Sequence, residues 1–356
     1  MKKIIVDMMG GDHAPAETIR GVLLAKEELD VEFLLVGNRE KLEASAKELG
    51  VSLDGFEIVH TEVEITMEDD PISAVRAKQD SSMSTGLRLL AEGRGDAFVS
   101  AGNTGALFTG ANLIVRKLKG VRRPAIAAVL PMTPPVLLLD SGANLTVTPE
   151  YLEQFSVMGS VYMKEMMGVE RPRVGLLNNG TEDHKGTELQ IEAYKILSNN
   201  PQINFVGNIE GNAVMRDRCD VLVCDGFSGN ILLKTMEGMG KLMGSMLKNL
   251  FTVGPMTKIG YLFVKPHLGD LKKNFDASEY GGAPILGIAK PVIKAHGSSK
   301  AKAFKNAIRQ AMNAAENDLT SDLTAELAIL AERKKAEKAE AKSSEPTTEE
   351  STERNL

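Results

Sequence analysis

The stretch Ser100-Ala101-Gly102-Asn103-Thr104-Gly105 combines hydroxyl and amide donors with two glycines and carries no charged side chain. An apolar run at residues 97–99 precedes it, and apolar residues recur at helical spacing over 106–115, so we expect a strand, a tight loop and a helix. Glycine lets the main chain approach a ligand, and the first N–H groups of a helix lack intrahelical partners. Such a loop suits a phosphate or a developing oxyanion. The alternative is a turn that needs glycine for its geometry alone.

Polar, glycine-bearing loops also follow other apolar runs of the chain. They lie at residues 7–13, 140–144, 178–186, 207–212 and 225–230. Because open parallel sheets bind ligands at the carboxyl ends of their strands, we expect these loops to share one cleft. Any single Asn-Gly pair can instead be a simple turn.

Few charged groups are placed to serve such a cleft. The candidates are Lys185, His296, Arg76 and Lys78, and a solvated surface turn explains the last two equally well. No phosphate-binding G-x-x-x-x-G-K-[ST] and no strand-borne G-x-G-x-x-G occurs, Ser228 lies in G-F-S-G-N, and the five histidines lack the spacing of a zinc site. We therefore expect a site that positions an anion and stabilises charge, without a covalent nucleophile or a metal.

The composition is that of a globular chain with a sizeable core. The chain has 356 residues, of which 43% are hydrophobic, and its net charge of −6 argues against a general nucleic-acid surface. Cys219 and Cys224 lie in or beside one apolar run, so we expect buried thiols in a reducing cytoplasm. A strand within a few residues of Met1 leaves no room for a signal peptide, and no apolar run reaches the length of a membrane span.

Apolar runs and helical patterns alternate along the chain, which is typical of an α/β fold. We expect strands at residues 4–6, 33–36, 56–59, 97–99, 125–130, 136–139, 174–177, 205–206 and 221–224. Helices are expected from Pro15 to about residue 29, over 39–49 and 106–115, and from Pro71 and Pro149 onward.

Six motifs lie in collinear order between residues 1 and 315. They are DMMGGDHAP (7–15), SAGNTGA (100–106), NNGTEDHKG (178–186), DGFSGNILLK (225–234), EYGGAP (279–284) and HGS (296–298). Together they resemble the bacterial phosphate acyltransferase family of phospholipid synthesis. The residues beyond Leu319 match nothing distinctive.

The resemblance implies a three-layer α/β/α fold with a mostly parallel sheet, similar to the isocitrate dehydrogenase and phosphotransacetylase group, with a protruding helical element. It implies that orthophosphate attacks the thioester of a long-chain acyl-(acyl carrier protein), and that the acyl phosphate passes to a membrane glycerol-phosphate acyltransferase. It also implies a homodimer without metal or organic cofactor. Two alternatives are an oxidoreductase of the isocitrate dehydrogenase type, which binds a nicotinamide cofactor, and a non-catalytic scaffold of lipid synthesis.

Three residues are assigned catalytic roles in that reaction. Asn103, with the neighbouring Thr104 amide, and Lys185 are alternative donors to the developing oxyanion. His296 either protonates the departing thiolate or caps the helix that follows it. The substrate-binding candidates are Asp7, Gly10, Gly11, Asp12, Arg76, Lys78, Ser100, Gly102, Thr104, Gly105, Asn178, Gly180, Glu182, Asn208, Asp225, Gly226, Ser228, Gly229 and Asn230.

Residues 231–267 contain an amphipathic helix and an apolar tip. One apolar stripe of the helix consists of Met236, Met239, Met243, Met246 and Leu250, with lysines every seventh residue on the opposite side. We expect this stripe to face a dimer partner or the acyl chain. The tip is too short to span a bilayer, and its flanking lysines suit anionic headgroups, so we expect Ile259, Leu262 and Phe263 to insert into lipid.

The densest basic run within the matched region covers residues 116–123. It is the candidate dock for the acidic carrier protein, although solvation is the commoner fate of such runs.

We divide the chain into a catalytic α/β domain, residues 1–320, and a C-terminal tail. Residues 231–280 protrude from that domain as the amphipathic helix and tip. The tail, residues 321–356, is expected to be helical and then disordered, because the stretch from Ser343 has almost no apolar residues.

Overall fold

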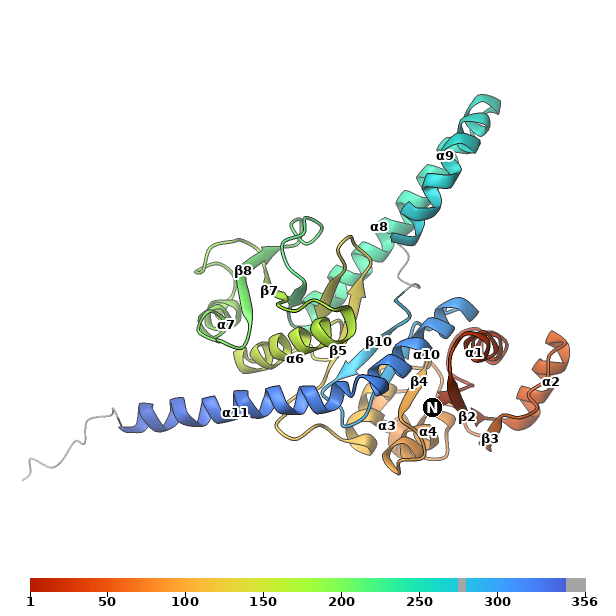
Figure 1. Cartoon of the computed structure of the whole chain (residues 1–356), viewed down its shortest axis with the longest axis horizontal. Coiled ribbons are helices and arrows are strands. Elements are labelled where there is room, and N and C mark those ends of the chain that lie inside the picture. Colours follow the sequence, from red (N-terminus) through yellow and green to blue (C-terminus); the bar gives the residue numbers. More distant parts are fainter. Residues whose placement is uncertain (275–279, 344–356) are drawn as a thin grey trace, which may run out of the picture.

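The computed structural model describes residues 1–274 and 280–343, which form one eleven-stranded sheet with helices on both faces (Figure 1). The strands are β1 Lys2–Asp7, β2 Val31–Gly37, β3 Glu57–His60, β4 Ala97–Ser100, β5 Ala125–Leu130, β6 Val136–Leu139, β7 Arg173–Asn178, β8 Asn204–Glu210, β9 Val221–Val223, β10 Gly282–Leu286 and β11 Val292–Ala295. The helices are α1 Ala16–Glu28, α2 Arg39–Leu49, α3 Pro71–Ala77, α4 Ser82–Ala91, α5 Thr104–Gly110 with the π-helical turn η1 Ala111–Val115, α6 Pro149–Met167, α7 Glu188–Ser198, α8 Gly226–Thr252, α9 Pro255–Asn274, α10 Ala301–Glu316 and α11 Leu319–Ser343.

Successive residues of β1 face opposite helical layers, as the two-residue period of a strand requires. Ile4 and Val6 pack with residues of α1, α2 and α10, whereas Ile5 packs with residues of α3, α4 and α5. Leu138 of β6 likewise faces α8, while its two neighbours face α6. The sheet is therefore the middle of three layers, which confirms the predicted α/β fold.

The sheet order is β3-β2-β1-β4-β11-β10-β5-β6-β9-β7-β8. The strands β3, β2, β1, β4 and β11 are mutually parallel, and so are β6, β9, β7 and β8. Three antiparallel pairings separate these groups, so the second group runs opposite to the first. The mostly parallel sheet is confirmed. The loops that were expected to share one cleft therefore do not all lie at one edge of the sheet, because apolar runs do not reveal strand direction.

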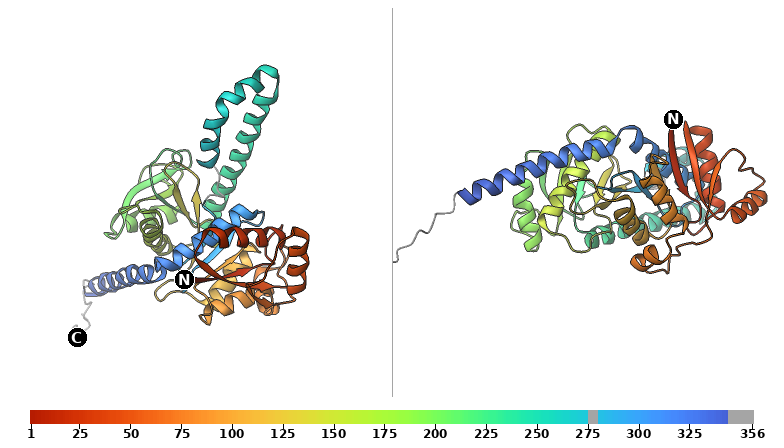
Figure 2. Two further views of the ribbon diagram at one scale, coloured as in Figure 1. Left: turned by 45° about the vertical axis from the view of Figure 1, so that its right-hand side comes forward. Right: turned by 90° about the horizontal axis from the view of Figure 1, so that it is seen from below.

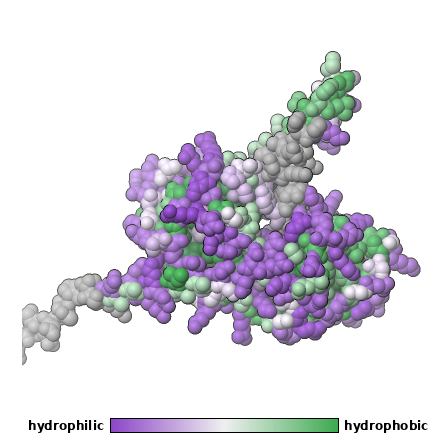
Figure 3. All heavy atoms as spheres, viewed as in Figure 1, coloured by the Kyte–Doolittle hydropathy of each residue, from purple (hydrophilic) through white to green (hydrophobic). Residues whose placement is uncertain are grey.

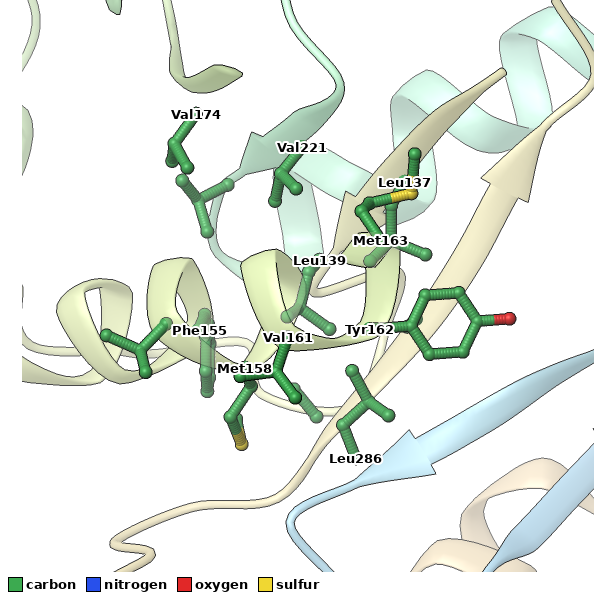
Figure 4. Close-up of a cluster of buried hydrophobic side chains, with 14 of the residues drawn as sticks. Leu137, Leu139, Phe155, Met158, Val161, Tyr162, Met163, Val174, Val221 and Leu286 are labelled. Carbon is green, nitrogen blue, oxygen red and sulfur yellow. The ribbon is translucent and has the colours of Figure 1, made fainter. Parts of the chain in front are cut away.

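Helix α6 covers the part of the sheet that contains β6, β9 and β7. Its Phe155 and Tyr162 are buried in one cluster with Leu139 of β6 and Leu286 of β10 (Figure 4). The Tyr162 hydroxyl accepts a hydrogen bond of 2.8 Å from Gln310 Nε2, so the only polar atom of this buried side chain has a partner.

The first half of α11 packs into the same core. Leu323 and Leu330 are buried there, and Arg333 and Lys334 both pair with the carboxylate of Glu153, which is 1% exposed. The predicted helical stretch is therefore present. The division of the chain at residue 320 stays a prediction, although this packing joins the start of α11 to the core.

Helices α8 and α9 form a hairpin that stands away from the sandwich (Figures 1 and 2). At its far end the side chains of Ile259, Leu262 and Phe263 are 53%, 65% and 78% exposed, and apolar atoms dominate this end in Figure 3. The rings of Phe251 and Tyr261 contact each other there, with centroids 5.4 Å apart. None of the helices in residues 1–274 and 280–343 combines the length and the apolar character that crossing a membrane requires.

Several predicted element boundaries differ from the structure. Residues 226–230, expected as a loop, form the first turn of α8, and β8 runs to Glu210 through much of the expected loop 207–212. Pro15 is the residue before α1 and not its first residue. Glu279 of the EYGGAP motif and the expected disordered stretch 344–356 lie outside the described residues.

Candidate active site

The loops that follow β1 and β4 are joined by a buried pair of side chains. The Ser100 hydroxyl donates to Asp7 Oδ2 at 2.7 Å, and its oxygen accepts from the Gly102 N–H at 3.0 Å. Burial raises the pKa of Asp7, while hydrogen bonds from Ser100, Ser82 and two main-chain N–H groups lower it in part. The structure thus brings together Asp7 and Ser100, two predicted site residues that are far apart in the sequence.

Glycines allow the three loops after β1, β4 and β11 to touch. A Cβ added to Gly10 would lie 2.6 Å from the main-chain nitrogen of Gly102, and Gly11 has φ +113°, a conformation that favours glycine. The Asp12 N–H donates to the Gly297 carbonyl at 2.9 Å. We call this meeting point the three-loop junction: residues 7–12, 100–105 and 296–298.

The side chain of Asn103 is occupied within the protein. Its Oδ1 accepts from the Ala106 N–H at 3.0 Å and so caps α5, while Nδ2 donates to the carbonyls of residues 66, 67 and 69 at 3.2–3.3 Å. A catalytic role for Asn103 is therefore limited to its main-chain N–H. Thr104 is exposed beside it, and a Cβ on Gly105 would collide with Pro71.

His296 holds the turn after β11. Its Nδ1 accepts from the Ser298 N–H at 3.2 Å and lies 2.9 Å from the Ser298 hydroxyl oxygen. The alternative that His296 caps the next helix is wrong, because α10 begins at Ala301 after Lys300. Partial burial and the nearby Lys234 lower the pKa of His296 below its usual value, which favours the neutral ring. Because Nδ1 accepts from the Ser298 N–H, the proton of the neutral ring lies on Nε2.

The loops after β6 and β9 form a second buried cluster, centred on Asp140. Its carboxylate accepts from the main-chain N–H groups of residues 126, 142, 143 and 144 and from the side chain of Asn144. Burial raises the pKa of Asp140. A Cβ on Gly226 would lie 2.8 Å from the Asn144 nitrogen, and one on Gly229 would lie 2.0 Å from the Asp140 carbonyl oxygen.

Asp225 caps the first turn of α8. It accepts from the Ser228 N–H and hydroxyl, both at 2.8 Å, so these two predicted ligand groups bond to each other. Asn230 is exposed near Gly142. A helix cap and a ligand-binding loop have the same sequence pattern, which explains why Asp225 and Ser228 were expected to bind a ligand.

The loop after β7 carries Lys185. The Asn178 side chain donates to the Lys185 carbonyl at 3.0 Å, and Asn208, which lies within β8, donates to the Glu182 carbonyl at 2.7 Å. A Cβ on Gly180 would lie 2.9 Å from Lys185 Cγ. The Lys185 side chain is exposed, and in the described part of the chain its ammonium has no hydrogen-bond or ion-pair partner.

The structure brings these loops together in two groups. In register, Leu139 and Leu176 both flank Val223, so the ends of β6, β9 and β7 lie at one edge of the sheet. Helix α8 starts at this edge, and its Lys234 and Lys241 act electrostatically on His296 of the three-loop junction. Among the described residues, no hydrogen bond or ion pair joins Lys185 to the Ser100 loop.

The two residues near α3 that were expected to bind an anion, Arg76 and Lys78, differ in their surroundings. Lys78 pairs with Asp69 at 2.5 Å and donates to the Glu64 carbonyl at 3.0 Å, so its charge is used locally. Arg76 is exposed. A cavity of about 210 Å³ between α6 and α11, lined by Lys164, Arg171 and other charged residues, includes none of the predicted site residues.

The comparisons with known proteins decide between the alternatives. A phosphotransacetylase from Streptococcus pyogenes aligns with a TM-score of 0.58 at 18% identity, over 89% of this chain and 94% of that one, which concerns the fold alone. Residues 2–322 match the family model described as fatty acid synthesis protein. A phosphate acyltransferase of Thermoanaerobacterium thermosaccharolyticum is 46% identical over 308 residues, 86% of this chain and 91% of that protein. One of Acetivibrio thermocellus is 47% identical over 307 residues, 86% of this chain and 90% of that protein.

The chain belongs to the phosphate acyltransferase family. It is therefore an enzyme of acyl transfer, with phosphate and an acyl donor as substrates, and the oxidoreductase and scaffold alternatives are not retained. The predicted resemblance is confirmed.

In a phosphate acyltransferase, a buried positive charge beside a polar loop is a candidate for phosphate binding. Lys294 is such a residue, and it was not identified from the sequence. Its Nζ donates to the Ala101 carbonyl at 3.2 Å and to the Ala295 carbonyl, and the residue is 7% exposed. Burial lowers the pKa of Lys294 to about 8, while Asp12 and Asp7 raise it in part. The available signal was a lysine inside the apolar run PVIKA.

Proposed function

We propose that this enzyme moves a long-chain acyl group from acyl-(acyl carrier protein) to orthophosphate. A phosphate oxygen attacks the thioester carbonyl, the C–O bond forms, the C–S bond breaks, and the thiolate leaves and takes a proton. Phosphate dianion is nucleophilic at neutral pH, so alignment of the two reactants matters more than a strong base. The observation that carries the proposal is 46% identity to a phosphate acyltransferase over 86% of the chain.

The proposal needs no covalent acyl-enzyme. The two cysteines are buried, and burial raises the pKa of Cys219 to about 12 and that of Cys224 well above its usual value. A thiol that stays protonated is a poor nucleophile. This supports direct attack by phosphate, and the proposed reaction uses no metal or organic cofactor.

We place the phosphate at the three-loop junction. Gly10 and Gly102 pack against each other there, so main-chain groups of two loops are close together where larger residues would hold them apart. The main-chain N–H groups of Asn103 and Thr104, or the exposed ammonium of Lys185, stabilise the oxyanion, a contribution of about 3 kcal/mol per donor in other enzymes.

His296 acts as a hydrogen-bond donor toward the leaving group. Its lowered pKa favours the neutral ring, in which Nε2–H donates to the departing sulfur. The other substrate-binding candidates act through loop structure: Asp7, Ser100, Gly11 and Asp12 at the junction, and the capping residues at the start of α8.

The hairpin α8–α9 has two proposed partners. Its exposed apolar stripe, which includes Met243 at 56% and Met246 at 62% exposure, pairs with a second copy of the chain in a homodimer. The tip at Ile259, Leu262 and Phe263 contacts an anionic membrane from the cytoplasmic side, where a membrane glycerol-phosphate acyltransferase receives the acyl phosphate.

The test is thiol release from palmitoyl-(acyl carrier protein) by the purified enzyme, with and without phosphate. Release that requires phosphate and saturates with it supports the proposal. Thiol release at the same rate without phosphate indicates a hydrolase, and no release from the carrier thioester removes this donor from the proposal.

A further inference from the structure

Lys294 lies at the end of β11, directly beside Ser100. The parallel register of β11 and β4 pairs the two residues, and the lysine side chain turns under the loop after β4 to donate to the Ala101 carbonyl at 3.2 Å. A second bond goes to the Ala295 carbonyl. The ammonium therefore borders the three-loop junction at Ala101, and only 7% of the residue is exposed.

The charge of Lys294 has no carboxylate bonded to it in the described residues. Asp7 acts on it electrostatically, but the Asp7 oxygens accept hydrogen bonds from Ser100, Ser82 and main-chain N–H groups. Asp12 also attracts the ammonium from the loop after β1. Burying an ammonium without a carboxylate partner is unfavourable, and titratable groups with strongly shifted pKa values concentrate at functional sites.

The Ala101 carbonyl ties this charge to the loop after β4. Ala101 is followed by Gly102, whose N–H donates to Ser100 Oγ, and by Asn103, whose side-chain oxygen caps α5. A change at Lys294 therefore acts on the orientation of the loop as well as on its electrostatic potential.

We propose that Lys294 is the positioning residue of the phosphate site, which fixes the Ser100–Gly105 loop through the Ala101 carbonyl and supplies the positive charge that draws phosphate to the three-loop junction. This inference rests on the proposed phosphate transfer.

A pH dependence follows from the groups around Lys294. Asp7, Asp12 and Lys234 act on it from the loop after β1 and from α8, and His296 is two residues away in the chain. The pKa of Lys294 is lowered to about 8, so the ammonium is present below this pH and is lost as the pH rises through it. Affinity for phosphate falls across the same range.

The experiment compares Lys294→Met, Lys294→Arg and the control Lys290→Met. Lys290 lies two residues before β11, and its side chain donates to the Gly95 carbonyl at 3.4 Å. We expect Lys294→Met to raise the KM for phosphate roughly tenfold or more and to leave the KM for the acyl donor nearly unchanged, because a charge-assisted interaction is lost at one substrate only. The pH limb near 8 should disappear, and the control should behave as wild type.

Two further readouts separate this inference from a general loss of structure. Inorganic phosphate alone should raise the melting temperature of the wild type and of Lys290→Met but not of Lys294→Met. Lys294→Arg stays charged at high pH, so it should recover phosphate affinity and extend it above pH 8. If Lys294→Met fails to fold, this arginine variant decides the question.

The inference is overturned if a folded Lys294→Met keeps the wild-type KM for phosphate and the wild-type pH profile, or if Lys294→Arg keeps the limb near pH 8. Wild-type enzyme that releases no thiol with phosphate contradicts the proposed function instead, while the melting experiment still reports on phosphate binding at Lys294.

Discussion

Ser100 and Asp7, 93 residues apart in the chain, are joined by a buried hydrogen bond of 2.7 Å. The bond ties the end of β4 to the end of β1, and the serine oxygen also receives the Gly102 N–H. The shape of the loop that follows β4 therefore depends on a carboxylate at the N-terminus of the chain.

Ser100→Ala should lower stability and weaken phosphate binding. The substitution leaves one Asp7 oxygen and the Gly102 N–H without this partner, which should reduce the free energy of unfolding by about 1–3 kcal/mol. Denaturant unfolding measures the loss, and phosphate titration of the rate measures the KM. Ser45→Ala on α2 is the control. Unchanged stability and KM in Ser100→Ala would mean that the Asp7–Ser100 bond does not shape the loop.

Besides the oxyanion role proposed above, the exposed ammonium of Lys185 is a candidate counter-charge for phosphate, so Lys185→Ala should raise the KM for phosphate far more than the KM for the acyl donor. The two KM values are measured in the same preparation, with the exposed Lys195→Ala on α7 as the control. Equal effects on both substrates would contradict the assignment and would favour a role of Lys185 at the oxyanion or in the loop structure.

Arg122 and Arg123 are exposed, and among the described residues neither guanidinium forms an ion pair. If the basic run steers an acidic carrier protein, the rate with the carrier thioester should fall with salt, and Arg122→Glu with Arg123→Glu should flatten that dependence. Stopped-flow rates at several salt concentrations measure it, and Lys47→Glu on α2 is the control. A salt dependence that survives the double reversal places the dock elsewhere.

Replacing Ile259, Leu262 and Phe263 by serine should abolish flotation of the protein with anionic vesicles, because the exposed apolar surface of the hairpin tip is removed. Activity on a soluble acyl donor should survive. The matched control replaces the exposed Val51 of the α2–β3 connection by serine. Vesicle binding that persists in the triple variant would exclude the tip as the anchor.

Truncation should distinguish the two parts of the C-terminal segment. A stop after Ala341 should leave activity and melting temperature unchanged, whereas a stop after Thr320 removes buried Leu323 and Leu330 and uncovers the Glu153 carboxylate. We expect the shorter protein to lose several degrees of melting temperature or to fail to fold. A drop of several degrees on stopping after Ala341 would refute the expected dispensable tail.

Much of the fold follows from local patterns. The runs at 125–130 and 136–139 and the helix at 39–49 coincide with β5, β6 and α2, because each combines continuous or periodic apolar residues with flanking turn residues. Strand direction does not follow from such patterns. Antiparallel β10 comes from the far end of the chain and inserts between β11 and β5, a long-range pairing without a local signature.

The site was predicted in part, for physical reasons that particular residues show. Glycines and hydroxyls in the sequence mark the residues of the three-loop junction as site candidates. Asn103 and Asp225 were expected at a ligand, but capping a helix uses the same oxygen acceptors. In the sequence, a lysine within a short apolar run is typical of an exposed edge strand. The burial of Lys294 arises only in the assembled sheet, where β11 lies next to β4.

The most direct test of the central claim identifies the product of a single turnover. Enzyme in excess over palmitoyl-(acyl carrier protein) is mixed with ¹⁸O-labelled phosphate, and the acyl phosphate, the free thiol and the intact protein are measured by mass spectrometry. Direct transfer predicts acyl phosphate equal to the thiol released, all four labelled oxygens retained, and no acylated protein when phosphate is omitted. Thiol release with an acylated protein in the absence of phosphate, or fatty acid in place of acyl phosphate, would contradict it.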